Sequence, residues 1–112
     1  MRKHQELSLE QIIKQMRVDK LVSDDFCLYA KEYGELRINS LYWVSDYPDV
    51  VEDSDVYPTD VVERDLQLVY YGEQLLDVLS VALEEKPDAS LQDLVDSLNY
   101  YNRYDIFMNF ES

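Results

Sequence analysis

Near the N-terminus, the apolar residues recur every three or four positions, which is the spacing of an amphipathic helix. The pattern begins after Ser8, and Gln11 lies three positions later, so the two residues can form a capping box at the start of the helix. We predict that this helix buries one stripe of side chains, namely Leu9, Ile12, Ile13 and Met16.

Two longer helical patterns occupy the C-terminal half of the chain, over residues 73–86 and 90–104. Pro87 ends the first pattern, and Ser90 with Asp93 supplies a capping box for the second. The apolar positions of the second pattern are Leu91, Leu94, Val95, Leu98 and Tyr101. Because only a short turn separates the two patterns, we predict that they form a helical hairpin.

Short strands are predicted where β-branched and aromatic residues gather, at 26–30, 35–46 and 67–72. The alternation of the middle segment shifts phase near Asn39 and Ser40, which indicates a bulge. After that shift Trp43 shares a strand face with Leu41, and we expect Trp43 to be a core residue. A short helix is expected over 59–66.

Together these elements predict an α+β fold, with about three helices packed on a small three- or four-stranded, mostly antiparallel sheet. The length suits one globular domain over residues 1–112, and no repeat, linker or low-complexity segment divides it. The apolar tail at 105–110 is expected to be held against the domain, as a last helical turn or as an edge strand.

The chain is strongly acidic, with 24 Asp and Glu against 10 Lys and Arg and a net charge of -14. Residues 1–20 hold five bases and three acids, which leaves 5 bases and 21 acids, a charge near -16, in residues 21–112. Such a surface repels nucleic acid and anionic membranes and attracts cationic partners. We therefore expect no direct binding to nucleic acid or to a membrane.

The sequence features that bear on location predict a cytoplasmic protein. The N-terminus lacks the apolar region of a secretory signal, and no stretch approaches the roughly 18 apolar residues of a spanning helix. Cys27 is the only cysteine, so an internal disulfide is impossible. It lies in an apolar run, where we expect a small buried side chain and not a reactive thiol.

One segment of the chain concentrates negative charge: residues 45–60 read SDYPDVVEDSDVYPTD, with six carboxylates and no Lys or Arg. Tyr and Val alternate with the acids, a combination suited to a surface that binds Lys and Arg while making apolar contacts. A solvated loop is the alternative interpretation. The residues predicted to contact a partner are Asp46, Tyr47, Asp49, Glu52, Asp53, Asp55, Tyr57 and Asp60.

Residues for familiar catalytic chemistry are scarce. His4 is the only histidine, and it lies at a terminus expected to be mobile, so no histidine-based triad or metal site can be assembled within this chain. Gly34 and Gly72 are the only glycines, which leaves no glycine-rich loop for phosphates. Paired carboxylates could serve a glycosidase, but a domain of this length rarely provides a sugar cleft.

A calcium loop is also a poor match. An EF-hand loop starting at Asp53 would place Pro58 and Arg64 where glycine and glutamate are needed, although clustered carboxylates can bind divalent ions adventitiously. We therefore predict that the protein is not an enzyme and that it uses no cofactor and no metal.

The C-terminal sequence LLDVLSVALEEKPDASLQDLVDSLNYYNRYDIF places a helix, a proline-containing break and a second helix before NYYNRYDIF. This arrangement resembles a family of small acidic bacterial proteins, some of which look like immunity proteins of contact-dependent growth-inhibition systems. The resemblance covers roughly the second half of the chain. It implies a cytoplasmic protein that binds and neutralises the C-terminal domain of a cognate toxin, in many cases a basic nuclease, and it assigns no role to any single residue.

Two other functions are compatible with the composition. A nucleic-acid mimic that inhibits a DNA-binding protein would spread its carboxylates along an elongated surface, whereas an immunity protein can concentrate them on one epitope. The sequence concentrates some acids and scatters others. A non-enzymatic adaptor is the third possibility.

Overall fold

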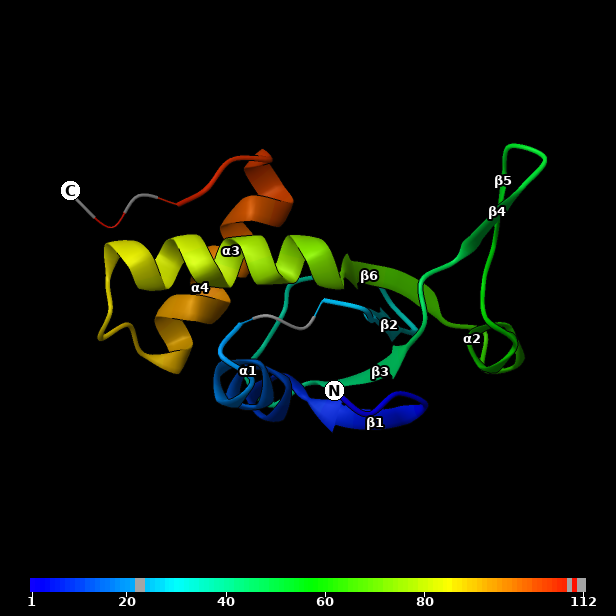
Figure 1. Cartoon of the computed structure of the whole chain (residues 1–112), viewed down its shortest axis with the longest axis horizontal. Coiled ribbons are helices and arrows are strands. Elements are labelled where there is room, and N and C mark those ends of the chain that lie inside the picture. Colours follow the sequence, from blue (N-terminus) through cyan, green and yellow to red (C-terminus); the bar gives the residue numbers. More distant parts are fainter. Residues whose placement is uncertain (22–23, 109, 111–112) are drawn as a thin grey trace.

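The computed structural model of the chain describes residues 1–21, 24–108 and 110. Within these residues, four helices accompany a four-stranded sheet and a separate two-stranded sheet (Figure 1). Every pair of neighbouring strands is antiparallel, and the main sheet has the order β1-β3-β2-β6. The predicted α+β class is confirmed.

The elements follow the chain in this order: β1 (Gln5–Ser8), α1 (Leu9–Val18), β2 (Cys27–Ala30), β3 (Leu41–Ser45), β4 (Asp49–Val51), β5 (Ser54–Val56), α2 (Thr59–Glu63), β6 (Gln67–Tyr71), α3 (Gly72–Glu85) and α4 (Leu91–Tyr104). Strand β1 was not predicted. It is an edge strand beside β3, in the register Gln5↔Val44 to Ser8↔Leu41, and it runs directly into α1.

Both predicted capping boxes are present. The Ser8 hydroxyl accepts the backbone N–H of Gln11, whose side chain accepts the N–H of Ser8 in return. Ser90 and Asp93 make the same reciprocal pair at the start of α4. These caps satisfy amides that a helix leaves without internal partners, which explains why both helices begin where the sequence predicts.

The main core lies between one face of the four-stranded sheet and the helices α1, α3 and α4. Leu28 and Val44 of the sheet are fully buried in it, as are Ile12 of α1, Leu79 of α3 and Leu98 of α4. The predicted stripe of α1, from Leu9 to Met16, is buried as expected.

A smaller cluster forms on the opposite face of the sheet, where α2 lies. Its buried members are Cys27, Tyr29 and Val61, and Trp43 packs against them while staying partly exposed. The expectation that Trp43 belongs to the core face together with Leu41 is wrong: Leu41 is 56% exposed, and the alternation of β3 turns Tyr42 and Val44 inward instead. Cys27 is buried as predicted, and burial raises the pKa of its thiol to about 11.

The predicted strand over 35–46 forms only in its second half. Residues 31–40 are a loop, held where the Asn99 side chain accepts the Leu36 N–H at 2.7 Å and donates to the Leu36 carbonyl at 2.9 Å. The bulge expected near Asn39 and Ser40 is absent from this loop, and the register shift lies between Leu28 and Tyr29 of β2.

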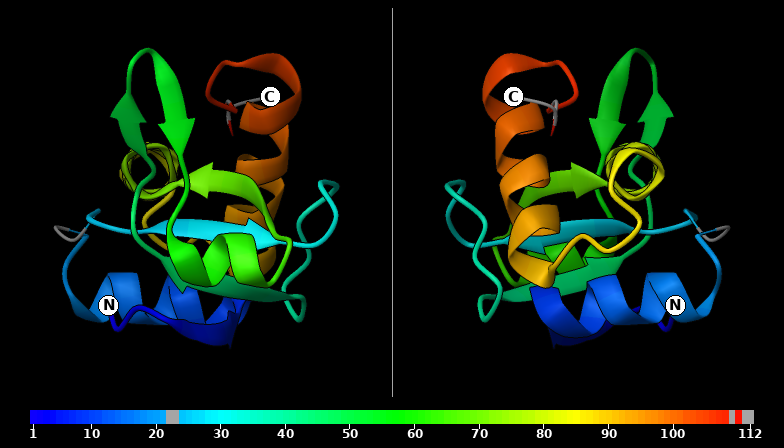
Figure 2. Two further views of the ribbon diagram at one scale, coloured as in Figure 1. Left: turned by 90° about the vertical axis from the view of Figure 1, so that its right-hand side faces the viewer. Right: turned by 90° about the vertical axis from the view of Figure 1, so that its left-hand side faces the viewer.

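The two helices α3 and α4 follow each other as predicted, but they do not lie antiparallel side by side. Instead, α4 crosses α3 at a steep angle (Figure 2). The tail is neither helix nor strand over 105–108 and at 110, and residue 109 lies outside the described residues. The ring of Phe107 nevertheless packs 5.3 Å from that of Tyr101, so this part of the tail does contact the domain.

Candidate functional site

The acidic segment folds into a β-hairpin that projects from one end of the molecule (Figures 1 and 2). We call residues 49–56 the hairpin arm. Strand β4 pairs with β5 in the register Asp49↔Val56, Val50↔Asp55 and Val51↔Ser54, and neither strand joins the main sheet. Every residue of the arm is exposed, so the segment is a two-stranded element in solvent and not an irregular loop.

The tip of the arm is a two-residue turn formed by Glu52 and Asp53. Both residues have positive φ angles, 50° and 65°, which identifies a type I′ turn. Such turns match the twist of antiparallel strands, although Asn and Gly adopt their backbone angles more readily than Glu and Asp. Like charges at adjacent turn positions add repulsion, so the sequence at the tip does not optimise stability.

Valine side chains stand uncovered among the carboxylates of the arm. Val50 is 71% exposed, Val51 is 53% exposed and Val56 is 49% exposed. In the register of the hairpin, Val50 lies opposite Asp55 and Val56 lies opposite Asp49. Each face of the arm therefore presents an apolar group beside a carboxylate, the pairing expected of a surface that buries contact area against a cationic partner.

The predicted residues before the arm are tied to the body of the protein. Asp46 forms an ion pair with Lys3 at 2.8 Å. The Tyr47 hydroxyl donates to the Asp24 carbonyl at 2.9 Å and accepts the backbone N–H of Glu73 at 2.8 Å. Burial raises the pKa of Tyr47, so this hydroxyl keeps its proton at neutral pH. Tyr47 thus anchors the base of the arm to the start of α3.

Asp60, which follows the arm, is also a structural residue. Its carboxylate accepts hydrogen bonds from the Trp43 indole at 2.7 Å and from the Ser45 hydroxyl at 2.9 Å, and Nδ1 of His4 lies 2.8 Å away. Burial opposes its ionisation, but the hydrogen bonds from His4, Trp43 and Ser45 outweigh burial and lower the pKa of Asp60.

The segment around His4 is packed against the main sheet in the structure. Besides its side-chain contact, His4 donates its backbone N–H to the Val44 carbonyl at 2.6 Å, which extends the pairing of β1 with β3.

The eight predicted contact residues thus fall into two groups. Asp46, Tyr47 and Asp60 hold the base of the arm, whereas the remaining five, Asp49, Glu52, Asp53, Asp55 and Tyr57, are exposed on the arm or next to it. The rings of Tyr57 and Tyr29 form a T-shaped pair with their centroids 6.3 Å apart, and Tyr57 is 36% exposed. The sequence pattern grouped the valines with the acids, but it did not predict that they lie together on a β-hairpin.

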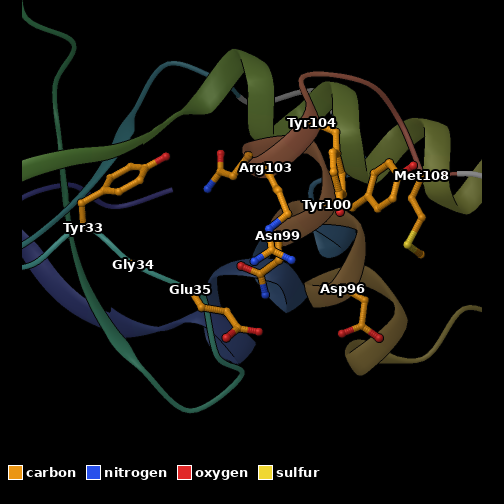
Figure 3. Close-up of a pocket in the computed structure, with 10 residues that line it drawn as sticks. Tyr33, Gly34, Glu35, Asp96, Asn99, Tyr100, Arg103, Tyr104 and Met108 are labelled. Atoms are coloured by element: carbon orange, nitrogen blue, oxygen red, sulfur yellow. The ribbon is translucent and has the colours of Figure 1, made fainter.

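Away from the arm, a hollow lies between the 31–40 loop and the C-terminal half of α4 (Figure 3). It is an open groove of about 760 Å³ that is lined by three tyrosines, Tyr33, Tyr100 and Tyr104, and by polar side chains that include Glu35 and Arg103. Asn102 also lines it, with a buried Nδ2 atom that finds no hydrogen-bond partner within the described part of the chain. With charges of both signs, this groove does not favour one class of ligand.

Comparison with known protein families gives one match, to the Domain of unknown function (DUF7716), over residues 6–110. The chain belongs to the DUF7716 family. Searches of curated proteins and of solved structures found no significant match. The match spans β1 to the tail, so the hairpin arm lies inside the DUF7716 domain.

Two further properties of this DUF7716 domain bear on the site. Over residues 1–21, 24–108 and 110, no group of three or more His, Cys, Asp and Glu side chains is placed to hold a metal ion. In the same part of the chain, no helix is long and apolar enough to cross a membrane.

Proposed function

We propose that this DUF7716 protein is a non-catalytic, cytoplasmic binding protein that captures and neutralises a cationic protein domain. A nuclease toxin domain is the partner that fits best, in the manner of an immunity protein. The observation that carries the proposal is the hairpin arm, which projects four carboxylates and three exposed valines with no Lys or Arg among them. The arm is the docking element.

Charge complementarity supports a basic partner. A nuclease must present a positive surface to the phosphates of its substrate, and an inhibitor that occupies this surface with carboxylates removes the substrate's binding site. The net charge of -14 would also steer the two proteins together, because attraction between oppositely charged surfaces raises association rates. Rapid capture is advantageous when each free toxin molecule does damage.

The valines of the arm supply the part of the interaction that charge cannot. Carboxylates at the rim of an interface mainly affect the association rate, whereas a desolvated apolar centre controls dissociation. The three valines of the arm are exposed in the free protein, so binding would not have to pull them out of the core. Covering each of them with a partner would be favourable because it removes apolar surface from water. Exposed apolar side chains on a projecting strand pair are otherwise a liability for aggregation.

The mixture of acids and valines on the arm favours a surface that binds a protein domain over a surface that mimics nucleic acid. A mimic needs carboxylates at phosphate-like spacing over an extended surface, with few apolar groups between them. In the arm, by contrast, each of the two outer cross-strand pairs joins one Asp to one Val, namely Asp49 to Val56 and Val50 to Asp55.

Charge neutralisation tests the proposal. We would replace the four acids of the arm by their amides, as Asp49→Asn, Glu52→Gln, Asp53→Asn and Asp55→Asn. The matched control neutralises four exposed acids elsewhere, as Glu32→Gln, Asp77→Asn, Glu84→Gln and Glu85→Gln. The test requires a cognate toxin domain, to be sought in the genes that neighbour the gene for this protein. Association and dissociation rates with that domain would be measured at low and high salt.

We expect the arm variant to lose at least about tenfold in association rate at low salt and to lose most of its salt dependence, because screening acts over roughly 10 Å at 0.1 M. The control variant has the same net charge and should lose less. Equal rates for the two variants, or full protection of cells by the arm variant, would rule out the arm as the docking element.

A further inference from the structure

The backbone of the hairpin arm has polar groups that no strand pairs with. In a two-residue type I′ hairpin, the residues next to the turn form a hydrogen-bonded pair, which in the arm is Val51 with Ser54. Hydrogen-bonded and non-bonded pairs alternate along an antiparallel ladder. The next pair, Val50 with Asp55, is therefore non-bonded, and the N–H and C=O groups of both residues point away from the hairpin.

The two outer edges of the arm differ in what they offer to another strand. On the edge of β4, the next outward position toward the body is Pro48, which has no N–H to donate. On the edge of β5, the corresponding position is Tyr57, which has both groups. Among the described residues, the backbone groups of Asp55 and Tyr57 form no backbone–backbone hydrogen bond outside the hairpin. The edge of β5 is therefore the open one.

We propose that the outer edge of β5 takes up an extended, basic segment of the partner protein as a third strand of the arm. This inference rests on the proposed function and specifies its binding mode. Backbone hydrogen bonds from Asp55 and Tyr57 hold the segment in register, and side chains select its sequence. Addition of a strand also completes a sheet of three strands, the number at which a small sheet becomes independently stable.

The side chains along β5 define which segment fits. Asp55 lies on the face of the arm that also carries Val50, and Val56 lies on the other face. A segment that alternates Lys or Arg with an apolar residue places its base beside Asp55 and its apolar residue beside Val56. The base makes an opposite-charge pair, and the apolar residue covers a side chain that is 49% exposed in the free protein.

Charge also explains why the edge would not take a second copy of this chain. Two β5 edges in contact would bring Asp55 of one copy close to the carboxylates of the other, and like charges on adjacent strands destabilise the pairing. Natural proteins protect exposed edges against self-association with charged side chains of this kind. The acids of the arm thus keep the edge free for a basic strand.

A short synthetic peptide of alternating Lys and Val serves as the probe, and the same peptide N-methylated on every Lys serves as the control. An antiparallel strand that places Lys beside Asp55 directs its Lys N–H groups toward β5, so N-methylation removes these donors while the charge of the peptide is kept. Nuclear magnetic resonance of the full-length protein would follow amide exchange during titration. We expect slower exchange of the Asp55 and Tyr57 amides and an unchanged rate for Val50, with the N-methylated peptide binding more weakly.

Paired variants separate the edge from its charge. Asp55→Asn removes the charge and keeps the N–H, whereas Asp55→Pro removes both and leaves the hydrogen bonds within the hairpin intact. We expect the Pro variant to bind the peptide about fivefold to tenfold more weakly than the Asn variant, the value of one lost backbone hydrogen bond. Val50→Pro places the same ring on the opposite edge. It removes one exposed valine but no donor of β5, so it should weaken peptide binding less than Asp55→Pro does and leave the Asp55 and Tyr57 amides protected.

The outcomes discriminate between the binding mode and the function. Equal binding by the Asn and Pro variants, or unprotected Asp55 and Tyr57 amides in the unmodified protein with bound peptide, would overturn strand addition. Neither result would argue against the proposed function, in which the acids of the arm dock on a cationic partner. That proposal is tested by the fourfold neutral variant of the arm. A protein dimer in sedimentation that Asp55→Pro abolishes would show instead that a second copy occupies the edge, and would also overturn the inference.

Discussion

Nδ1 of His4 lies 2.8 Å from Oδ2 of Asp60, although the two residues are 56 positions apart in the sequence. The same carboxylate accepts hydrogen bonds from Trp43 and Ser45 of β3. Asp60 therefore joins the N-terminal segment, the main sheet and the segment that follows the hairpin arm. A carboxylate with this many donors stabilises the fold through its ionised form.

The substitution Asp60→Asn is expected to destabilise the protein at neutral pH. Asn keeps one oxygen for Trp43 or Ser45 but loses the charge, so at least one donor is left with a weaker partner or none. We expect a loss of roughly 1 to 3 kcal/mol in the free energy of unfolding, measured by urea denaturation. Asp55→Asn is the control, because Asp55 is exposed on the arm and should change stability little.

The effect of Asp60→Asn should depend on pH in a defined direction. The folded-state pKa of Asp60 is lowered from its ordinary value of 3.8, so its stabilising effect is complete above that value and is lost as the pH falls through the folded pKa. The difference in stability between the two proteins should therefore be constant near neutral pH and shrink only as the pH falls below the ordinary pKa of 3.8. A difference that stays constant even at low pH would show that the charge of Asp60 contributes nothing.

The substitution Gly72→Ala should be strongly unfavourable, even though Gly72 is the first residue of a helix. A Cβ atom at this position would overlap the carbonyl oxygen of Phe26 and lie 2.7 Å from that of Asp24. Both are backbone atoms, so they cannot rotate away. We expect a loss of about 1 to 3 kcal/mol or more, measured by thermal or urea unfolding.

The other glycine provides the matched control for this substitution. A Cβ atom at Gly34 would meet nothing within 4 Å, and the φ angle there is not positive. Gly34→Ala should therefore be neutral or stabilising by up to about 1 kcal/mol, because it restricts the unfolded chain. Similar losses at both positions would contradict the close approach of Gly72 to the segment before β2.

The helices were the most predictable part of this fold. Their signals are local, since a capping box needs only two side chains three positions apart, as in Ser8 with Gln11 and Ser90 with Asp93. The periodic apolar stripe of α4 likewise identified Leu98 as a core residue, and Leu98 is fully buried.

The parts that sequence reasoning missed depend on contacts between distant residues. Trp43 was assigned to the core because it alternates with Leu41, but which face of a strand is buried is decided by the elements that cover it. Strand β1 exists because Gln5–Ser8 pairs with β3, a relation with no local signature. The hairpin was missed because its turn, Glu52 with Asp53, lacks the Asn or Gly that marks a type I′ turn.

The turn of the arm gives the last prediction. Glu52 has a φ angle of 50°, a conformation that costs most residues roughly 1 kcal/mol or more and that Asn tolerates better. We compare Glu52→Asn with Glu52→Gln, since both remove the same charge and differ in backbone preference. The Asn variant should form the hairpin more fully, seen as stronger cross-strand nuclear Overhauser effects between Val50 and Asp55.

The same pair of variants also tests whether docking requires a preformed arm. Binding to a preorganised element avoids the cost of ordering it, so up to about 1 kcal/mol of added hairpin stability can appear as up to about fivefold tighter binding. We expect the Asn variant to bind the cationic partner more tightly than the Gln variant, mainly through slower dissociation. If the Asn variant forms more hairpin but binds no better, the partner contacts Glu52 and its neighbours in an extended, unpaired form, and strand addition to β5 becomes untenable.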